Sequence, residues 1–250
     1  MGESHTAAER DLVRAVPWGR SFEEYRAMFD LGVGAVGGRP FARAGERPRV
    51  LDVGGGPASF TAEAFGRGWE VVACDPLYGR DGAAIETSVM GARDRVMALV
   101  RAEPERFIWT SIDSPEALER LRLAALEAFL ADYDAGRAAG RYRPDGLPAL
   151  PFENGRFDLA LCSHLLFLYS ESLDADFHLA AIREMARVAR EVRIFPLLDM
   201  AGRRSPHLEP VLAGLTESGH RAALLPVPYE FQRGGTEMLR VVGPDTVEVS

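Results

Sequence analysis

The 250-residue sequence is poor in cysteine and in basic charge. Its two cysteines, Cys74 and Cys162, lie within apolar runs without C-x-x-C spacing, which predicts small core side chains rather than a metal or redox site. The net charge of −8 argues against a nucleic acid partner, because neutralising phosphates takes a basic face. No apolar run approaches a membrane span, and residues 1–14 lack the apolar core of a signal peptide. We therefore expect a cytoplasmic protein with a small or neutral substrate.

A glycine turn follows a short apolar run at residues 49–53. The run has the length and β-branched content of a buried strand, and it leads directly into Gly54, Gly55 and Gly56. Residues 59–65 then predict a short helix that ends in glycine. Glycines between a strand and a helix N-terminus let the backbone approach a ligand closely and leave N–H groups to face it.

A second predicted strand, residues 69–75, ends in an acid. Asp75 lies 23 residues beyond Asp52, close to the interval of about 20 at which an acid meets ribose hydroxyls in a nucleotide-binding βαβ unit. A carboxylate can accept hydrogen bonds from both hydroxyls. A helix cap or turn residue is the simpler interpretation of a lone acid, but its pairing with the glycine turn favours nucleotide binding.

The spacing of the turn distinguishes two kinds of nucleotide ligand. A dinucleotide fingerprint, G-x-G-x-x-G, needs glycine at position 59, which is Ser59 here. The stretch from Asp52 to Ala58 instead fits D-x-G-x-G-x-A. It resembles the first motif of the class I S-adenosylmethionine (SAM)-dependent methyltransferases, with Ala58 in place of the usual third glycine. By that resemblance, the acid and the turn hold the amino acid end of SAM.

Further strings carry the same resemblance. Residues 150–158, Leu-Pro-Phe-Glu-Asn-Gly-Arg-Phe-Asp, are similar to the L-P-F-x-(D/N)-x-x-F-D segment of small-molecule methyltransferases. The strings at 55–60, 75–78 and 193–198 resemble a bacterial subgroup whose substrate is unassigned. In the family, an N-terminal segment often closes over SAM and an acid before the 150–158 segment reaches the adenine amino group. The resemblance thus implies SAM as cofactor, no metal, and these cofactor-binding residues: Arg20, Tyr25, Asp52, Gly54, Gly55, Gly56, Ala58, Asp75, Pro76, Leu77, Asp145 and Ser163.

A candidate base follows the predicted strand at 158–164. Ligands of open α/β sheets bind outside the carboxyl ends of the strands, so His164 is expected where SAM and substrate meet. The unperturbed pKa of histidine suits removal of a proton from the atom being methylated. Tyr169 and Tyr229 are further candidates. The alternative is a histidine that packs on the adenine or hydrogen-bonds a loop.

The rest of the chain predicts how this site is framed. Residues 1–48 are expected to form an N-terminal helical extension or lid, with one helix over 7–15 and another from the capping box of Ser21 and Glu24 to Gly32. The methyltransferase domain would occupy 49–250, with a helical insertion at 104–140 that is either a packed decoration or a cap over the substrate pocket. The resemblance implies an α/β fold, a Rossmann-like doubly wound, mostly parallel seven-stranded sheet with a C-terminal antiparallel hairpin.

Several further elements are expected along the chain. Residues 32–48 predict a linker, and the third strand ends near Leu147. His178 is interpreted as a surface or capping residue. The terminal hairpin would pair 222–231 with 238–242.

These features predict a SAM-dependent methyltransferase that acts on an oxygen, nitrogen or carbon nucleophile of a small molecule. The enzyme would align donor and acceptor and remove a proton where the acceptor requires it. Two alternatives stay open at this point: a SAM- or S-adenosylhomocysteine (SAH)-binding protein without transfer activity, and a protein or RNA methyltransferase, with RNA disfavoured by the acidic balance. A dinucleotide-dependent oxidoreductase is the weakest rival.

Overall fold

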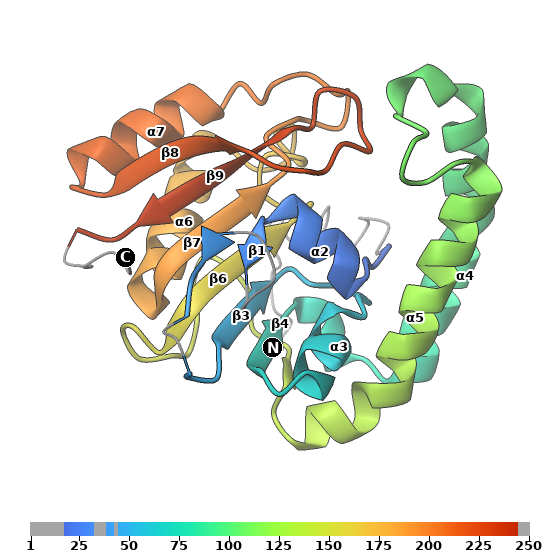
Figure 1. The fold of residues 1–250 in the computed structure, drawn as a ribbon, viewed down its shortest axis with the longest axis horizontal. Coiled ribbons are helices and arrows are strands. Elements are labelled where there is room, and N and C mark those ends of the chain that lie inside the picture. The colour runs from blue at the N-terminus through green and yellow to red at the C-terminus, as the bar shows by residue number, and fades with distance from the viewer. Residues whose placement is uncertain (1–17, 33–38, 43–44, 245–250) are drawn as a thin grey trace, which may run out of the picture.

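The computed structural model describes residues 18–32, 39–42 and 45–244 (Figure 1). Its centre is a seven-stranded sheet in the order β5-β4-β3-β6-β7-β9-β8. The first five strands in the chain order of this sheet run parallel, and β9 runs antiparallel to both of its neighbours. The predicted Rossmann-like sheet with a C-terminal antiparallel hairpin is confirmed. The strands are β3 (Arg49–Val53), β4 (Glu70–Cys74), β5 (Tyr142–Arg143), β6 (Phe157–Ser163), β7 (Ala189–Phe195), β8 (Arg221–Pro226) and β9 (Glu237–Val242).

Helices cover both faces of this sheet. They are α2 (Phe22–Met28), α3 (Phe60–Gly66), α4 (Gly82–Ala102), α5 (Pro115–Ala138), α6 (Ala175–Val188) and α7 (Leu208–Glu217), with short 3-10 helices η1 (Pro76–Gly79) and η2 (Pro104–Arg106). Successive strand residues point to opposite faces, so Leu51 packs in a cluster with α6 and α7, and Val50 packs in another with α2 and α3. All seven residues of β6 are buried, as a central parallel strand requires.

The N-terminal part differs from the prediction in where its helix ends. The capping box of Ser21 and Glu24 is present, but α2 stops at Met28 rather than continuing to Gly32. Asp30 has a φ of +48°, a left-handed backbone angle that no α-helix contains. Residues Leu31–Gly32 instead form strand β1, which pairs with β2 (Arg39–Pro40) in a small parallel sheet within the predicted linker. The helix predicted over 7–15 lies outside the described residues.

Two predicted strands are shorter in the structure because proline interrupts them. The third strand was expected to end near Leu147, but β5 contains Tyr142–Arg143 alone and Pro144 follows. The first strand of the terminal hairpin ends at Pro226 rather than at residue 231. Proline has no N–H to donate to a neighbouring strand, so the β5 ladder stops before Pro144. Beyond Pro226 one further bond, from the N–H of Val227 to the carbonyl of Thr236 at 2.9 Å, remains between the two arms of the hairpin.

The long helices α4 and α5 follow β4 and precede β5 in the chain. They form an antiparallel pair and lie side by side in Figure 1. Asp81 and Ser114 cap their N-termini, and Pro115 follows Ser114 as predicted. At the far end of the pair, the N–H of Ile108 donates to the carbonyl of Phe231 at 2.8 Å. The pair is therefore fastened to the connection between β8 and β9 as well as to the sheet. Among the described residues, no helix is both long and apolar enough to cross a membrane.

Candidate functional site

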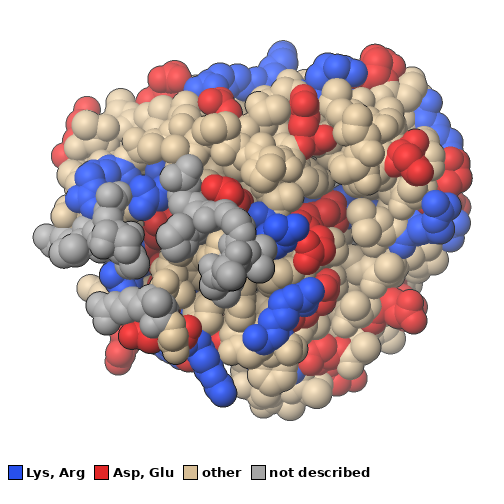
Figure 2. All heavy atoms as spheres, in the orientation of Figure 1, with Lys and Arg blue, Asp and Glu red and all other residues tan. Residues whose placement is uncertain are grey.

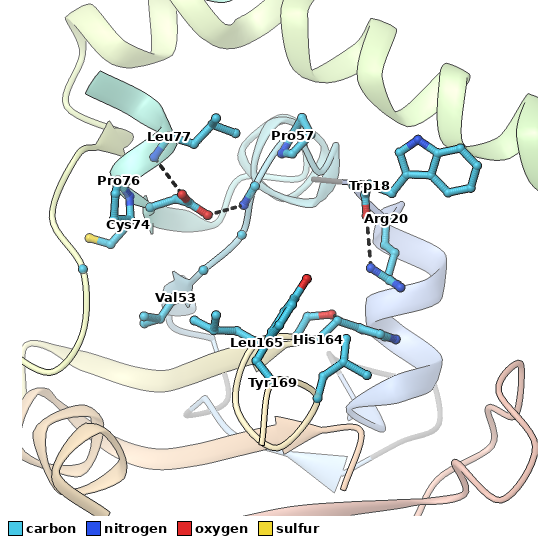
Figure 3. Close-up of a pocket in the computed structure, with 18 of the residues that line it drawn as sticks. Trp18, Arg20, Val53, Pro57, Cys74, Pro76, Leu77, His164, Leu165 and Tyr169 are labelled. Carbon is cyan, nitrogen blue, oxygen red and sulfur yellow. Dashed lines mark hydrogen bonds between the residues drawn. The ribbon is translucent and has the colours of Figure 1, made fainter. Parts of the chain in front are cut away.

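A cavity of about 1090 Å³ lies at the carboxyl ends of β3, β4 and β6 (Figure 3). Its walls come from the glycine turn, the segment before α2, one face of α4 and the loop after β6. This is the place where open α/β sheets bind their ligands. Within the described ranges, no cluster of His, Cys, Asp or Glu side chains is arranged to hold a metal ion.

The turn after β3 fits only glycine at its first three positions. Gly54 and Gly56 have φ angles of +69° and +55°, in the left-handed region that other residues rarely adopt. A Cβ atom at Gly55 would lie 2.4 Å from Oδ2 of Asp52, and one at Gly54 would lie 2.5 Å from the side chain of Leu165. The turn therefore presents bare backbone to the cavity.

Asp75 joins the turn to the end of β4. Its Oδ2 accepts a hydrogen bond from the N–H of Gly56 at 3.0 Å, and its Oδ1 accepts one from the N–H of Leu77 at 2.8 Å (Figure 3). Burial raises the pKa of Asp75, and these two hydrogen bonds oppose the rise. Each carboxylate oxygen has a second acceptor site, so Asp75 can still receive two hydroxyl donors from the cavity.

Asp52 lies beneath the turn rather than on the cavity wall. Its carboxylate is buried, and the hydroxyl of Tyr25 lies 3.2 Å from each of its oxygens. Burial is the main cause that raises the pKa of Asp52 to about 7. The hydrogen bond from Tyr25 opposes this rise, and the charge of Asp75 adds to it. Burial also raises the pKa of Tyr25 well above its ordinary value, so Tyr25 remains a donor. Together these two residues support Gly55 from below.

His164 lies at the end of β6 with its backbone in the left-handed region, at a φ of +55°. Its Nδ1 is 2.9 Å from the hydroxyl of Ser163, which leaves Nε2 as the ring nitrogen that could meet a ligand. Burial lowers the pKa of His164 well below 6.5, and the charges of Arg20 and Arg122 lower it further. The imidazole is therefore neutral at physiological pH.

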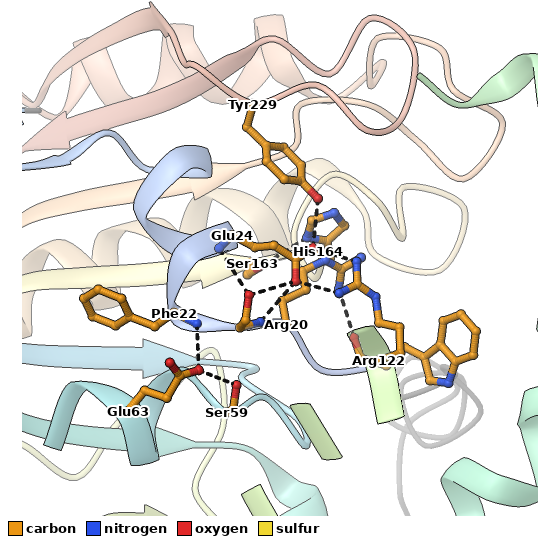
Figure 4. A network of polar contacts seen from close by, with 11 residues as sticks. Arg20, Phe22, Glu24, Ser59, Glu63, Arg122, Ser163, His164 and Tyr229 are labelled. Atoms are coloured by element: carbon orange, nitrogen blue, oxygen red, sulfur yellow. Dashed lines mark hydrogen bonds and ion pairs between the residues drawn. The ribbon is translucent and has the colours of Figure 1, made fainter. Parts of the chain in front are cut away.

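A buried ion pair lies behind His164 (Figure 4). Arg122 of α5 donates to both carboxylate oxygens of Glu24 of α2, at 2.6 and 2.7 Å, and the hydroxyl of Tyr229 donates to Oε1 at 3.1 Å. Burial alone would raise the pKa of Glu24, but the attraction and hydrogen bonds of Arg122 lower it to about 2. This pair joins α2, α5 and the connection between β8 and β9.

Arg20 is a second guanidinium beside this pair, and it lines the cavity. It donates to the carbonyl of Trp18 at 3.0 Å, and its buried Nε has no hydrogen-bond partner among the described residues. Burial and the charge of Arg122 lower the pKa of Arg20, which still stays far above neutrality as arginine does. One carboxylate, Glu24, therefore faces two guanidinium groups at this end of the cavity.

Most of the residues predicted for the site line one cavity. They are Arg20, Tyr25, Gly54, Gly55, Gly56, Asp75, Pro76, Leu77, Ser163, His164 and Tyr169. Asp52 and Ala58 are buried and do not line it, and Tyr229 binds Glu24 instead. Asp145, predicted for the adenine amino group, forms an ion pair with Arg143 at 2.7 Å, while its neighbours Pro144 and Gly146 line the cavity.

Other lining residues were not found from the sequence. Trp18 and a face of α4 formed by Ser88, Gly91, Ala92 and Arg95 belong to the cavity wall. Gly91, Ala92 and Arg95 follow Ser88 by three, four and seven residues, which is the spacing of one helix face. This face has small and polar residues, unlike the apolar face of the same helix. Arg122 also had a signal, because it follows Leu118 by four residues on the inward face of α5.

His178 is a correction to the sequence analysis. It was interpreted as a surface or capping residue, but it is fully buried. Its Nε2 accepts a hydrogen bond from the N–H of Phe167 at 2.9 Å, and its Nδ1 lies 2.6 Å from the carbonyl of Asp174. Phe167 has a φ of +65°, so His178 fixes the bend of the loop that follows His164.

Comparison with known proteins finds one relative with a significant match and several solved folds. No protein-family model matches the chain. An uncharacterized protein of Methanocaldococcus jannaschii is 28% identical over 230 residues, which cover 92% of this chain and 96% of that protein. Because this relative is archaeal, the bacterial subgroup suggested by the sequence remains a prediction.

Solved structures with a similar course of the chain include magnesium protoporphyrin IX methyltransferase from Synechocystis PCC 6803 with bound SAM. That structure is 12% identical, has a TM-score of 0.44, and the match covers 97% of this chain and all of that one. A SAM-dependent methyltransferase from Methanosarcina mazei is 14% identical, with a TM-score of 0.37 over 79% of this chain and 91% of its own. The fold assignment depends on the strand order of this chain and not on these likenesses.

Proposed function

We propose that this protein is a class I methyltransferase that uses SAM to methylate an oxygen, nitrogen or carbon nucleophile of a small molecule. The observation that carries the proposal is the junction of Asp75 with the glycine turn at the cavity. A carboxylate held by the N–H groups of Gly56 and Leu77 stands at the end of the second strand of the sheet. That is the place and the chemistry for binding the ribose hydroxyls of an adenosyl group.

The residues around this junction fit the other parts of SAM. Pro76 and Leu77 offer an apolar surface for the adenine, next to Gly146, which leaves room there. The bare backbone of the turn suits the amino acid end, and Arg20, whose Nε has no partner among the described residues, suits its carboxylate. A negative charge at Asp52 would favour the cationic sulfonium and ammonium groups.

Bound SAM supplies a methyl group on a positively charged sulfur, which is already activated for transfer. The chain's own residues then have two tasks, to align the acceptor and to accept its proton where it has one. His164 is the candidate for the second task, because its neutral ring can take a proton at Nε2. Since Arg20 and Arg122 depress the pKa of His164, a negative group bound beside them would make His164 a stronger base.

The helical additions are proposed to frame the acceptor side of the cavity. Trp18, Arg20 and Tyr25 line it from the N-terminal segment, which supports the predicted lid at 1–48. None of the described residues of the 104–140 insertion lines the cavity. We infer that the insertion braces the wall through Arg122 and does not itself cap the substrate pocket.

A small-molecule acceptor agrees with the charge distribution. On the face shown in Figure 2, acidic and basic side chains are interspersed over the visible surface. Nucleic acid recognition instead uses basic side chains gathered on one face. The cavity also lies within the protein among α2, α4 and the loop after β6, which suits a compact molecule better than a polymer.

Calorimetric titration with SAM and SAH tests the proposal. Both should bind and NAD should not. Asp75→Ala should weaken both by at least about 100-fold, because two hydrogen bonds to a charged group are lost. Asp134→Ala is the matched control, since the same substitution removes an exposed carboxylate on α5 that does not line the cavity. Failure of folded, ligand-free protein to bind either sulfur compound would contradict the proposal.

A further inference from the structure

The cavity is large for a small-molecule site. Its volume of about 1090 Å³ is slightly above the roughly 300–1,000 Å³ found for such sites. Of the residues proposed to hold SAM, Arg20 lies in the segment before α2, and the others lie at the turn, at Asp75 with the two residues after it, and at Gly146. The opposite wall is formed by α4 and Trp18, and no residue of that wall has a task in the proposed binding of SAM.

The α4 wall is built to leave space. Ser88, Gly91 and Ala92 present small side chains to the cavity, on one helix face with Arg95. A Cβ atom added at Gly91 would have no neighbour within 4 Å, so the cavity is open in front of it. Next to Arg95, Val96 packs in the same apolar cluster as Trp18, which places α4 beside Trp18.

The arginines of α4 divide into two sets. Arg93 and Arg101 point toward α5 and form ion pairs with Glu119 and Glu116. Arg95 lies between them in sequence, lines the cavity, and has no carboxylate partner within 4 Å among the described residues. The same helix thus uses its other arginines for structure and leaves Arg95, an exposed residue, as the arginine of α4 that lines the cavity.

Acidic groups do not balance these charges inside the cavity. Of the described residues that line it, Asp75 is the one acid, and its oxygens already accept two backbone hydrogen bonds. Besides Arg20, which is proposed to bind the carboxylate of SAM, Arg80 and Arg95 line it without a carboxylate within 4 Å among the described residues. In a protein with a net charge of −8, this concentration of guanidinium groups favours an anionic ligand.

We propose that the methyl acceptor is an anion, with a carboxylate or phosphate bound by Arg95 and an apolar body packed between Trp18 and the small face of α4. This inference rests on the proposed function. Arginine suits either anion, because its planar donors match the oxygens of both groups. Leu168 and Phe177, which also line the cavity, add apolar surface for that body.

Binding of matched probes to SAH-saturated protein tests the inference. The probes are 2-naphthoate, 2-naphthyl phosphate and the uncharged 2-naphthamide, titrated by calorimetry. At least one anion should bind about tenfold or more tighter than the amide, since one charge-assisted hydrogen bond is worth that factor. The anion that binds more tightly identifies the group as carboxylate or phosphate. Equal affinity of amide and anions, or binding of none of the three, would overturn the inference.

Three variants assign the effect to this wall. Arg95→Gln should remove the preference for the anion and leave the weak affinity of the amide. Arg101→Gln is the control, because it removes the same charge from the same helix at an exposed ion pair outside the cavity. Gly91→Leu should weaken all three probes by filling the space in front of α4. If Arg101→Gln also lost the preference for the anionic probes, the preference would come from the overall charge of the helix. That result would contradict a role for Arg95.

SAH saturation is itself measured in these titrations, which separates the two proposals. A folded protein that binds no SAH contradicts the proposed function. A protein that binds SAH but does not distinguish 2-naphthoate or 2-naphthyl phosphate from 2-naphthamide contradicts only the anionic acceptor.

Discussion

The two ends of the cavity are built by different means. At the end proposed for the adenosyl group, the geometry is set mainly by the backbone. The N–H groups of Gly56 and Leu77 hold the carboxylate of Asp75, and positive φ angles define the turn. At the end proposed for the acceptor, the geometry is set by side chains from separate elements. Arg122 of α5 forms an ion pair with Glu24 of α2 beside His164. The first end depends on local conformation and the second on tertiary packing.

The charges at the two ends differ in the same way. Burial raises the pKa of both Asp52 and Asp75 at the adenosyl end, and the charge of Asp75 raises that of Asp52 further. Arg20 and Arg122 surround one carboxylate at the other end and depress the pKa of His164. The sulfonium of SAM would relieve the excess negative charge of the first end. A carboxylate, that of SAM on Arg20 or that of an acceptor, would relieve the excess positive charge of the other. Changes at either end should therefore have distinct signatures.

The largest effect should come from breaking the buried ion pair. Arg122→Met leaves Glu24 buried without its cation, and removal of one partner of such a pair costs about 3–5 kcal/mol of unfolding free energy. The free energy is measured by urea denaturation at neutral pH. Arg20, proposed to bind the carboxylate of the cofactor, lies beside this pair. Because Glu24 would be left with Arg20 as its nearest cation, the SAH affinity of the remaining folded protein should also weaken.

The double variant Glu24→Gln, Arg122→Met is the control for that measurement. It removes the uncompensated charge, so it should recover part of the stability lost in Arg122→Met. A single variant as stable as the wild type would show that the pair makes no net contribution to folding.

Asp52 should make the stability of the ligand-free protein depend on pH. Its pKa is about 7 in the folded protein, against 3.8 ordinarily. Between these values the folded state holds more protons than the unfolded state, so stability falls as pH rises, by up to about 1.4 kcal/mol per pH unit, and levels off above the folded pKa. Urea denaturation of wild type and Asp52→Asn over this range checks the slope, which should be smaller in the variant.

Binding of the cofactor should also change the protonation of Asp52. A cationic ligand at the turn favours the ionised carboxylate, so binding of SAM near pH 7 should release a proton. Binding of SAH, which lacks the sulfonium charge, should release less. Calorimetry in buffers of different ionisation enthalpy measures the difference, and equal proton release by both ligands would show that Asp52 does not sense the sulfonium.

A smaller loss is expected at the adenosyl end from Gly55→Ala. The new Cβ would meet Oδ2 of Asp52 at 2.4 Å and the hydroxyl of Tyr78 at 3.1 Å. Overpacking of this kind costs about 1–3 kcal/mol of stability, and displacement of the turn should also weaken SAH binding. Gly66→Ala is the control, because a Cβ there has no neighbour within 4 Å. Equal thermal stability of the two variants would mean that the turn can shift without cost.

The local construction of the adenosyl end also explains why the sequence could predict it. The strand, the three glycines and Asp75 follow one another within a short stretch, so local pattern was sufficient to find them. The mostly parallel seven-stranded sheet with its terminal hairpin followed from the resemblance, and the structure adds the order of the strands. The role of Asp145 stays a prediction: its carboxylate pairs with Arg143, and its neighbours Pro144 and Gly146 line the cavity.

The acceptor end was harder to predict because its residues meet only in the folded chain. Glu24 and Arg122 are 98 residues apart, and Tyr229 is still farther along. Arg122 occupies an inward position of an amphipathic helix, which indicates a buried charge but names no partner. The same limit applied to His178, whose role depends on the bend at Phe167.

The smallest effect should come from Gly91→Ala on the α4 wall, and it should have the opposite sign to Gly55→Ala. Gly91 lies inside a helix, and a Cβ there meets nothing within 4 Å. Alanine is favoured over glycine in a helix interior by about 1 kcal/mol, so the unfolding free energy should rise by up to that amount. Urea denaturation of the two variants in parallel checks the signs. If Gly91→Ala destabilised the protein as Gly55→Ala is expected to, space in front of α4 would not exist in solution. The acceptor end would then be as tightly built as the glycine turn.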